Sequence, residues 1–402
     1  MAANAARPIN SKENMVRFLI LGAGELGYSI THDLIRSPRT EMVVVADKDA
    51  SKVQKLKESM ADEKIVPVEL DVEQEEYVAE LMAKADVAIS CLPATLHFDM
   101  AKLALSAKTS FCAVELCPDP ELSERLQLLD EVAKDEGVAI IPSIGLAPGL
   151  ISILAVSAAD SLDELYEIKI RLGVLPVENE GSLDEFRAKS FNPREFLHPV
   201  KLIKEGKVLE VPALTEADTL DFPAPIGKTE VFLSYGGAGR LPELYKGRIR
   251  HLDFKSIHYP GFLDRVSLLK DLGLFSNKAV ELPSGKDVIP GELTEKLLSA
   301  DTLEAADLVV IKIIVTGVKD EKPIQHVFDC VDYGDPAERI SACTRMTAYP
   351  ASIVAQMLAR EDIKGKGVLI PEEVVPARLF LAELDSRGIR LTMTERAPVV
   401  KD

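Results

Sequence analysis

The sequence lacks the features that mark membrane, secreted and nucleic-acid-binding proteins. No apolar run approaches the roughly 20 residues that a membrane-spanning helix needs, and residues 1–14 are polar, without the apolar centre of a secretory signal. Basic residues are few: 47 Lys and Arg stand against 65 Asp and Glu, which gives a net charge of −18. Such a surface repels nucleic-acid backbones and anionic lipids. We therefore expect no nucleic-acid or membrane partner, and we predict that residues 1–14 form a disordered leader.

Cysteine is also scarce and shows no metal or disulfide pattern. The five cysteines are odd in number and scattered, and no two of them form a C-x-x-C pair. This spacing argues against a zinc knuckle and against a disulfide framework. We predict that the protein has no metal site and that it works in the reducing cytoplasm.

The chain does contain enough apolar sequence for two or three domains, because 47% of its 402 residues are hydrophobic. Strand and helix patterns alternate over residues 15–142, which predicts an α/β fold with an N-terminal Rossmann domain, a doubly wound parallel sheet. Over residues 143–350, short strands, prolines and turns indicate a second α+β catalytic domain with a mixed or antiparallel sheet. Residues 351–402 are predicted to return to the Rossmann domain and to pack on it.

The most informative motif follows the first predicted strand. Phe18 to Leu21 run directly into a G-x-G-x-x-G loop that opens a helix. In such a loop the first glycine permits a tight turn, the second lets a pyrophosphate approach the backbone, and the third lets the helix pack on the strand. The free N–H groups at the start of the helix can then bind the phosphates. The loop predicts a dinucleotide cofactor held by Gly22, Gly24, Glu25, Leu26 and Gly27.

Asp47 ends the second predicted strand, about twenty residues beyond the loop, where a carboxylate can accept both ribose hydroxyls of the cofactor. A 2′-phosphate meets a negative charge there, so NAD is favoured over NADP. Lys48 follows directly and offsets part of this repulsion, which leaves NADP possible. The remaining residues predicted to bind the cofactor share a place at the carboxyl ends of later strands: Asp71, Cys91, Leu92 and Pro93.

Several further motifs follow in order along the chain. They are Ile144-Gly145-Leu146-Ala147-Pro148-Gly149, Ser234-Tyr235-Gly236-Gly237, Tyr259-Pro260-Gly261 and Gly367-Val368-Leu369-Ile370-Pro371-Glu372-Glu373. Together with the glycine loop, they give the chain, from Met15 to about Leu391, a resemblance to the saccharopine dehydrogenase-like superfamily. It is most similar to the lysine 6-dehydrogenase branch.

This resemblance implies an NAD(P)-dependent oxidoreductase that acts on a carbon–nitrogen bond of an amino acid. In the lysine branch a side-chain amine is oxidised to an imine and ammonia is released, whereas in the saccharopine branch the nitrogen is a secondary amine. Ala147 favours the lysine branch, since saccharopine reductases generally carry Asp at this place. The chain departs from the family at Phe262, where a histidine is usual, and at Ala238, where a threonine is usual. Both changes remove a polar group from the expected pocket wall.

Hydride transfer from an amine needs a deprotonated nitrogen close to the cofactor. Glu115, at the end of a strand, can pair with an ammonium, or it can simply bond the loop after Ile144. His97 follows the fourth strand and is a candidate base, although a histidine that opens a helix is more often a cap or a packing residue. His258 and Tyr259 end an alternating strand, so one of them is expected to point inward, and Tyr259 is the candidate catalytic residue.

A substrate carboxylate calls for a guanidinium or for backbone donors. Arg345 and Thr347 lie at a predicted strand-to-helix junction, where a helix N-terminus and Arg345 together can receive a carboxylate. The alternative is an ordinary N-cap by Thr347. The other predicted substrate-binding residues come from the motifs above and their neighbours: Glu115, Gly145, Pro148, Gly149, Ser234, Gly236, Gly237 and Arg240.

The sequence thus predicts a small amine or amino-acid substrate, NAD or NADP as cofactor, and the homodimer that is usual for such dehydrogenases. Three hypotheses stay open. The first is a lysine 6-dehydrogenase-like enzyme, and the second is a saccharopine- or opine-type dehydrogenase or reductase acting on a secondary amine. The third is a non-catalytic NAD-binding protein, which the histidine missing at Phe262 favours.

Overall fold

The computed structural model describes residues 15–114, 120–178, 183–188, 190–299 and 306–398. The chain divides into two compact units. Unit 1 consists of Met1–Val114, Pro120–Pro142 and Ala351–Ile370, and unit 2 consists of Glu115–Asp119, Ser143–Pro350 and Pro371–Asp402. The predicted leader over residues 1–14 lies outside the described residues. Within the described ranges, no helix is long and apolar enough to cross a membrane.

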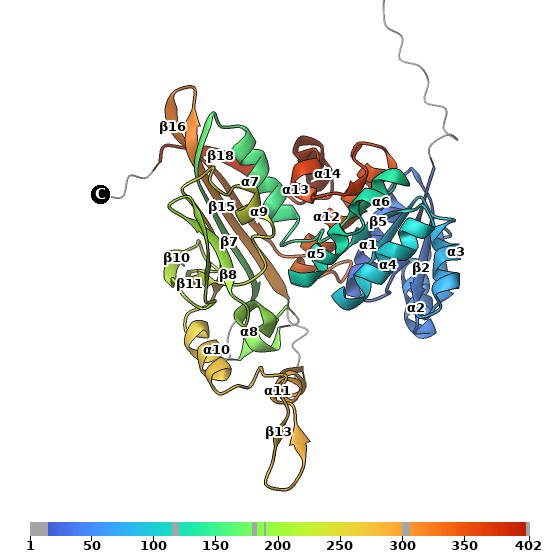
Figure 1. The fold of residues 1–402 in the computed structure, drawn as a ribbon, viewed down its shortest axis with the longest axis horizontal. Helices are drawn as coiled ribbons and strands as arrows, with labels where there is room; N and C mark the ends of the chain where they lie inside the picture. The colour runs from blue at the N-terminus through green and yellow to red at the C-terminus, as the bar shows by residue number, and fades with distance from the viewer. Residues whose placement is uncertain (1–14, 115–119, 179–182, 189, 300–305, 399–402) are drawn as a thin grey trace, which may run out of the picture. The chain divides into compact units, whose positions relative to one another are not determined.

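Unit 1 is built on a seven-stranded sheet with the order β17-β6-β5-β4-β1-β2-β3 (Figure 1). Every neighbouring pair is parallel, which confirms the predicted doubly wound sheet. The strands are β1 (Val16–Leu21), β2 (Thr40–Asp47), β3 (Ile65–Glu69), β4 (Val87–Ser90), β5 (Ser110–Ala113), β6 (Ala139–Ile141) and β17 (Gly367–Val368). Strand order reverses between β1 and β4, and the carboxyl ends of strands at such a switch point are where ligands bind.

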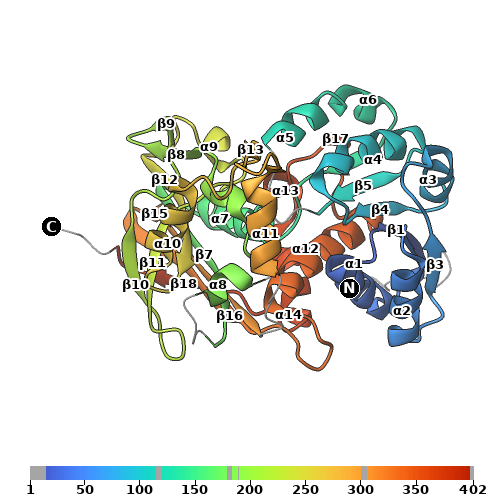
Figure 2. The ribbon, with the colours of Figure 1, turned by 90° about the horizontal axis from the view of Figure 1, so that it is seen from below.

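Helices cover both faces of this sheet (Figure 2). They are α1 (Glu25–Arg36), α2 (Ala50–Met60), α3 (Glu75–Met82), α4 (Ala94–Ser106), α5 (Pro120–Gln127) and α6 (Asp130–Asp135). Side chains of α3, α4, α5 and α6 share one apolar core with the strands, while α1 and α2 pack on β1, β2 and β3.

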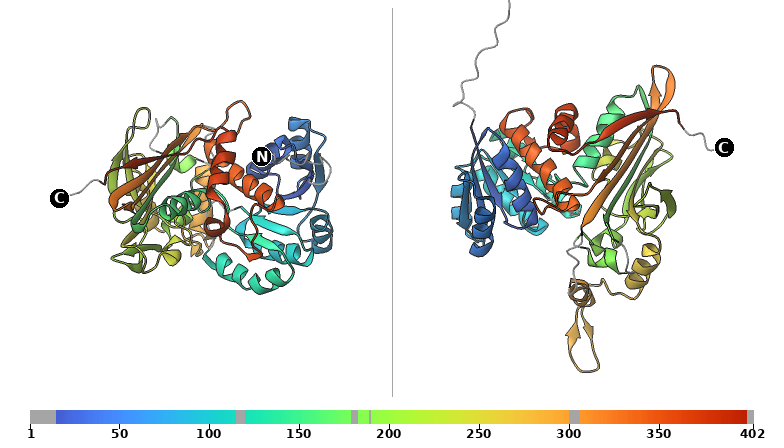
Figure 3. Two further views of the ribbon diagram at one scale, coloured as in Figure 1. Left: turned by 90° about the horizontal axis from the view of Figure 1, so that it is seen from above. Right: turned by 180° about the vertical axis from the view of Figure 1, so that it is seen from behind.

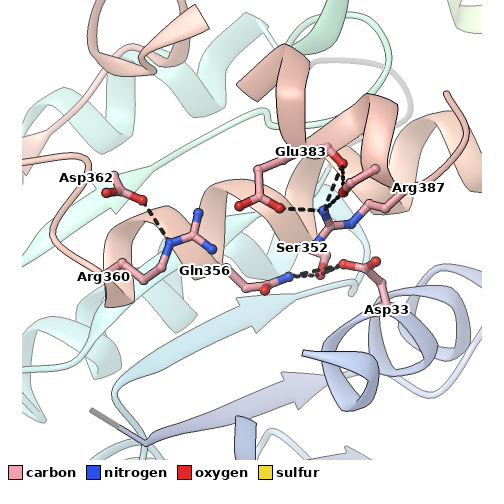
Figure 4. Close-up of polar contacts among 8 residues, drawn as sticks. Asp33, Ser352, Gln356, Arg360, Asp362, Glu383 and Arg387 are labelled. Atoms are coloured by element: carbon pink, nitrogen blue, oxygen red, sulfur yellow. Dashed lines mark hydrogen bonds and ion pairs between the residues drawn. The ribbon is translucent and has the colours of Figure 1, made fainter. Parts of the chain in front are cut away.

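A buried polar contact joins the first part of unit 1 to its late segment, Ala351–Ile370 (Figure 4). The carboxylate of Asp33 on α1 accepts hydrogen bonds from Ser352 Oγ at 2.6 Å and from Gln356 Nε2 at 3.1 Å. Both donors lie on α12 (Ala342–Ala359), which begins in unit 2 and ends in unit 1. A buried carboxylate without donors destabilises a fold, so these bonds favour the docking of α12 against α1.

Unit 2 contains a nine-stranded mixed sheet, whose longest strands run side by side (Figure 3). Its strands are β7 (Glu164–Pro176), β8 (Val200–Lys204), β9 (Lys207–Val211), β10 (Asp218–Asp221), β11 (Lys228–Leu233), β12 (His251–His258), β15 (Asp307–Lys319), β16 (Lys322–Asp332) and β18 (Thr392–Arg396). The β7–β12 pair is parallel and the others are antiparallel. A separate hairpin consists of β13 (Val280–Glu281) and β14 (Asp287–Val288). The predicted mixed sheet is confirmed.

The helical segments of unit 2 are α7 (Leu150–Asp160), α8 (Asp184–Arg187), the 3-10 turn η1 (Pro193–Phe196), α9 (Leu241–Leu244), α10 (Phe262–Asp271), α11 (Pro290–Ser299), α13 (Pro371–Val374) and α14 (Ala377–Ser386). Helix α7 contacts β7 and β15 on one side and α13 and α14 on another. This position explains why α7 is apolar around its whole circumference.

The end of the chain differs from the expectation that residues 351–402 all return to the Rossmann domain. Gly367–Val368 do so, since β17 pairs with β6. From Pro371 onward the chain belongs to unit 2, because β18 forms an antiparallel pair with β16, whose other edge pairs with β15. The chain thus contributes one late strand to each sheet.

Candidate functional site

The glycine loop of unit 1 has the geometry of a phosphate cradle. Gly22 has φ +103°, a conformation that side chains rarely adopt. A Cβ on Gly27 would lie 1.9 Å from the carbonyl oxygen of Gly22, so only glycine lets α1 pack so close to the loop. A Cβ on Gly24 would meet nothing within 4 Å, so the backbone there borders open space. The loop and the first N–H groups of α1, which include those of Glu25 and Leu26, fit the pyrophosphate of a dinucleotide.

Asp47 stands at the carboxyl end of β2, and its carboxylate accepts hydrogen bonds from backbone N–H groups on two loops. Ala23 N donates at 2.8 Å and Asp49 N donates at 2.9 Å. The first bond fixes the carboxylate beside the glycine loop, where a ribose would lie. Lys48 is exposed and projects from the same turn. A carboxylate held in this place can accept the ribose hydroxyls of a bound dinucleotide.

The other predicted cofactor residues lie at the same sheet edge. Asp71 follows β3 and accepts from Glu73 N at 3.1 Å. Cys91 follows β4, and its carbonyl oxygen would be 3.1 Å from a Cβ on Gly22, so the loops after β1 and β4 touch. Burial raises the pKa of the Cys91 thiol to about 12, so it stays a neutral thiol. Leu92 and Pro93 lead into α4.

His97 lies inside α4 and not in the loop before it. Its side chain is fully buried, and Nδ1 is 3.1 Å from Ser90 Oγ. Burial lowers the pKa of His97 to about 4, so the imidazole is neutral near pH 7. Nε2 has no partner among the described residues. These features describe a packed histidine of the unit 1 core.

Unit 2 contains a pocket of about 260 Å³. Apolar and small side chains make most of its wall: Leu146, Ala147, Leu172, Gly173, Val174, Phe191, Phe196, Gly236, Gly237, Phe254, Ile257, Phe262 and Cys343. The remaining lining residues are polar: Glu185, Ser190, Asn192, Glu195, Tyr235, Ser256, His258 and Thr347. None of the described residues in this wall is Arg or Lys, so the pocket combines apolar contact with negative charge.

Glu195 is one of the two carboxylates in the pocket. It lies on η1, whose first turn is fixed by Asn192 Oδ1 accepting from Arg194 N at 3.1 Å. Burial raises the pKa of Glu195 to about 8, which means that its charge is costly while the pocket holds no cation. Its carboxylate has no hydrogen-bond partner among the described residues. An ammonium group is the kind of ligand that relieves this cost.

Glu185 is the second carboxylate, and it is bound to His258. The imidazole Nδ1 of His258 lies 3.0 Å from Glu185 Oε1, and its Nε2 lies 3.0 Å from Ser256 Oγ. Two phenyl rings lie nearly parallel to the imidazole, with centroids 5.0 Å away at Phe232 and 4.0 Å away at Phe262. The histidine is therefore fixed in its plane as well as at both nitrogens.

Predicted substrate residues from the glycine-rich motifs lie at or beside this pocket. Gly236, Gly237 and Thr347 line it. A Cβ on Gly237 would lie 2.1 Å from the ring of Phe254, so this part of the wall requires glycine. Three other predicted residues, in the loop before α7, do not line the pocket: Gly145, Pro148 and Gly149. Their neighbours Leu146 and Ala147 do line it.

Ser234 and Arg240 lie away from the pocket lining. Ser234 is fully buried at the end of β11, and its hydroxyl has no partner among the described residues. Arg240 precedes α9, and its backbone N–H and positive charge both act on the buried carboxylate of Glu372. Burial still raises the pKa of Glu372 to about 7. Arg240 is thus engaged with α13, in the segment of the last family motif.

Two predicted catalytic residues, Tyr259 and Arg345, make structural contacts within unit 2. The hydroxyl of Tyr259 donates to the carbonyl of Pro176 at 3.1 Å, and its ring joins an apolar cluster, so His258 is the member of the pair that lines the pocket. Arg345 lies in α12, donates to the carboxylate of Asp332, and donates to the carbonyl of Arg387 at 2.7 Å. Neither Tyr259 nor Arg345 lines the pocket.

Thr347 and Glu115 complete the predicted set. Thr347 is not an N-cap, because its hydroxyl donates to the carbonyl of Cys343 one turn earlier in α12. The N–H groups of Ala342 and Cys343 instead donate to Asp307. Glu115 lies outside the described residues. Among the residues that the structure does describe, no cluster of three metal-ligating side chains is present.

Three residues of the pocket were not among the predicted site residues: Glu185, Glu195 and Ser256. The first two lie in the segment between β7 and β8, where short turns leave no periodic pattern. A usable signal was the density of phenylalanine in that segment: Phe186 and Phe196 join Phe232 and Phe262 in one buried cluster, with Phe191 packed against it. Ser256 could have been found from period two, because it stands two residues before His258 on the same strand.

Comparison with known proteins gives a consistent result for both units. Residues 18–141 match the family model described as saccharopine dehydrogenase NADP binding domain. Residues 145–389 match the model described as saccharopine dehydrogenase C-terminal domain. The second match alone covers more than half of the chain.

Two curated relatives and one solved structure extend this finding. The carboxynorspermidine synthase of Vibrio cholerae is 25% identical over 413 aligned residues, which cover 94% of this chain and 97% of the relative. The NADP-dependent, L-glutamate-forming saccharopine dehydrogenase of Pyricularia oryzae is 27% identical over 279 residues, which cover 66% of this chain and 60% of the relative. The L-glutamate-forming saccharopine dehydrogenase of Saccharomyces cerevisiae, in its apo form, has the same fold, with a TM-score of 0.73, 21% identity and coverage of 95% and 100%.

Proposed function

Because this chain belongs to the saccharopine dehydrogenase family and is an NAD(P)-dependent oxidoreductase, we propose that it oxidises the carbon–nitrogen bond of a cationic amine bound in the unit 2 pocket. The cofactor supplies the hydride acceptor when it is bound. The residues that fit it are the glycine loop and Asp47, for which NAD is the better match. The substrate would be held by the pocket residues.

The observation that carries this proposal is the charge of the pocket. Its wall contains the carboxylates of Glu185 and Glu195, and none of its described residues is Arg or Lys. Glu185 is occupied by His258, whereas Glu195 is free to accept a ligand. An ammonium bound to Glu195 would gain a charge-assisted hydrogen bond in a largely apolar enclosure, where such bonds are strong. The apolar wall would bind the carbon chain of the amine.

The favoured substrate is the side-chain amine of lysine or a closely similar primary amine, which is released as ammonia after oxidation and hydrolysis. Ala147, the residue by which the chain resembles lysine 6-dehydrogenases, lines the pocket. Saccharopine itself carries several carboxylates, and an acidic pocket without Arg or Lys among its described residues is a poor match for it. The favoured substrate therefore carries more positive than negative charge on the part that is bound in the pocket.

A second candidate is a secondary amine with polyamine character, formed by reduction of an imine. The likeness to carboxynorspermidine synthase supports it, since that alignment covers nearly the whole of both chains. The names of the two curated relatives refer to secondary amines, and carboxynorspermidine, which has more amino groups and fewer carboxylates than saccharopine, is the more cationic of the two. The same acidic pocket would accept such a compound.

A direct assay distinguishes these candidates. The purified protein is mixed with NAD or NADP and separately with L-lysine, cadaverine, saccharopine and spermidine, and reduced nicotinamide is followed by absorbance. Turnover with L-lysine and release of ammonia supports the first candidate. Turnover only with saccharopine or spermidine replaces it by the second. Absence of turnover with every amine, in either direction, contradicts the proposal.

The homodimer and the cytoplasmic location expected from the sequence stay predictions. Light scattering coupled to size-exclusion chromatography measures the first, with a mass of twice 43.9 kDa as the expected result. Fractionation of source cells measures the second.

A further inference from the structure

Three polar side chains of the unit 2 pocket form one continuous chain of hydrogen bonds. Ser256 and His258 alternate along β12, so both side chains lie on the same face of the sheet. Ser256 Oγ lies 3.0 Å from His258 Nε2, and His258 Nδ1 lies 3.0 Å from Glu185 Oε1. All three residues line the pocket. The order from the hydroxyl to the carboxylate is Ser256, His258, Glu185.

The carboxylate end of this chain sets the direction of the hydrogen bonds. Glu185 is buried on α8, and it also accepts from the backbone N–H of Tyr259 at 3.3 Å. An ionised carboxylate only accepts hydrogen bonds, so Nδ1 of a neutral His258 must carry the proton. Nε2 is then an acceptor, and the hydroxyl of Ser256 donates to it. This tautomer leaves the basic nitrogen linked to the pocket through Ser256.

The surroundings of His258 keep this arrangement in place. The rings of Phe232 and Phe262 both lie nearly parallel to the imidazole, and Phe196 meets it edge-on with centroids 6.0 Å apart. Rotation of the imidazole away from Glu185 would require these rings to move. The elements packed around the ring carry the following charged or titratable residues: Asp184, Glu185 and Arg187 on α8, Arg194 and Glu195 on η1, Lys228 and Glu230 on β11, His251, Asp253 and Lys255 on β12 with Tyr259 after it, and Asp264, Arg265, Lys270 and Asp271 on α10. Glu230 stands opposite His258 on β11, but its two oxygens accept from Gly261 N and Leu263 N.

We propose that Ser256, His258 and Glu185 form a proton relay that deprotonates the substrate nitrogen; the inference rests on the proposed function. The ammonium donates its proton to Ser256 Oγ while the hydroxyl proton of Ser256 moves to His258 Nε2. The resulting imidazolium is paired with Glu185. The free amine has the lone pair that can assist loss of a hydride from the adjacent carbon, which leaves an iminium. The dinucleotide that the glycine loop and Asp47 would hold would supply the acceptor for that hydride. The proton on His258 passes to solvent, which restores the relay.

Within this relay the residues have different roles. Ser256 is the group that touches the substrate nitrogen, and His258 accepts the proton through it. Glu185 is a positioning residue, which fixes the tautomer and stabilises the imidazolium. Glu195 holds a cationic group and takes no part in the proton transfer.

The kinetic test uses the variants S256A, H258N and E185Q of the full chain. General acid–base groups of this type contribute about 10²- to 10⁴-fold to the rate, so S256A and H258N should lower kcat by that order while KM changes only a few-fold. The pH profile of kcat should differ from that of wild type in H258N, because the proton acceptor is gone. E185Q should keep measurable activity with an altered pH profile. H251N, at the exposed start of the same strand, is the matched control and should behave as wild type.

A second readout is independent of turnover and of the cofactor. Protein labelled with ¹⁵N-histidine is observed by NMR, and the His258 signals are assigned by their loss in H258N. We expect the Nδ1–H tautomer, and we expect addition of L-lysine or spermidine to shift the His258 signals and to leave His251 unchanged. The H258G variant lacks the imidazole ring beside Phe232 and Phe262, so free imidazole can bind in its place. Added imidazole should therefore restore part of kcat in H258G.

The outcomes separate the two proposals. If wild type turns over no amine, the proposed function fails. The relay is then still tested by NMR, through the tautomer of His258 and the shift of its signals on addition of amine. An Nε2–H tautomer, or an H258N variant that folds with wild-type melting temperature and keeps the wild-type kcat and pH profile, overturns the relay.

Discussion

The imidazole of His258 and the phenyl ring of Phe262 lie parallel, with centroids 4.0 Å apart and an angle of 6° between the planes. Phe262 occupies the place where the family pattern has a histidine. The polar group missing there is therefore replaced by a ring that holds another histidine in the pocket. The loss of the family histidine does not leave the pocket without one.

The first prediction concerns this stack. Phe262→Leu keeps an apolar side chain but removes the ring contact, which in aromatic pairs is worth about 0.5–1.5 kcal/mol beyond burial. We expect a modest fall in melting temperature and a larger fall in kcat than in the affinity for amine. Phe275→Leu is the control. It removes a ring of the same cluster that packs against Phe191 and not against His258, so it should lower stability without lowering kcat. Equal kinetic effects of the two variants would contradict the assigned role.

The second prediction concerns cofactor choice. The carboxylate of Asp47 is held beside the glycine loop by Ala23 N, so Asp47→Ser should weaken NAD binding and relieve the repulsion of a 2′-phosphate. Losing a hydrogen bond to a charged group costs about 1.5–3 kcal/mol, which corresponds to a change of about tenfold or more in the NAD/NADP ratio of kcat/KM. Lys48→Ala should move the ratio in the opposite direction. An unchanged ratio in D47S would show that Asp47 does not discriminate the cofactors.

The third prediction follows from the raised pKa of Glu195, about 8. In the empty pocket this carboxyl holds a proton below about pH 8, and a cationic amine must displace that proton in order to pair with it. The affinity for L-lysine or spermidine should therefore rise with pH up to about pH 8 and then level. Glu195→Gln should bind the amine more weakly and lose this pH dependence. Glu210→Gln, an exposed residue on β9, is the control, and calorimetry between pH 6 and pH 9 measures the difference.

The fourth prediction concerns His97, whose pKa is lowered to about 4 from an ordinary value of 6.5. Below pH 6.5 the unfolded chain binds this proton and the folded unit does not, so stability is complete above pH 6.5 and is lost as the pH falls toward 4. A shift of this size corresponds to about 3 kcal/mol at the acid end. His97→Asn should be less stable at pH 7 but should lose less stability on acidification. Urea unfolding at several pH values, followed by a probe in unit 1, decides this, and parallel curves for the two proteins would disprove the linkage.

The architecture of unit 1 was predictable because its signals are local. Strands buried on both faces of a parallel sheet are continuous apolar runs, and Phe18 to Leu21 or Val43 to Ala46 cannot be mistaken for surface segments. Gly27 is required by a contact with the carbonyl oxygen of Gly22 in the same loop. The sequence could not show that Asp33 binds Ser352 and Gln356, since that contact joins positions more than three hundred residues apart.

The site of unit 2 was harder to predict because its side chains come from irregular segments and distant strands. Arg345 has the chemistry of a carboxylate receptor, but Asp332 on β16 binds it instead, and nothing near Arg345 in the sequence indicates that partner. The sequence could not show which of His258 and Tyr259 lines the pocket, because that depends on their contacts with Glu185 and Pro176. Glu195 stands in a 3-10 turn, where no periodic pattern distinguishes an inward from an outward residue.

The pairing of β17 with β6 has a consequence for biosynthesis. The residues of the first six parallel strands leave the ribosome early, but Gly367–Val368 follow more than two hundred residues after β6 ends at Ile141. Until then the outer edge of β6 has no strand partner, and Asp130 lacks the N–H of Val368 that its carboxylate binds at 2.8 Å. An open edge of this kind can pair with other chains. A nascent or prematurely terminated chain that ends before Gly367 would therefore expose an unpaired sheet edge that is prone to aggregation.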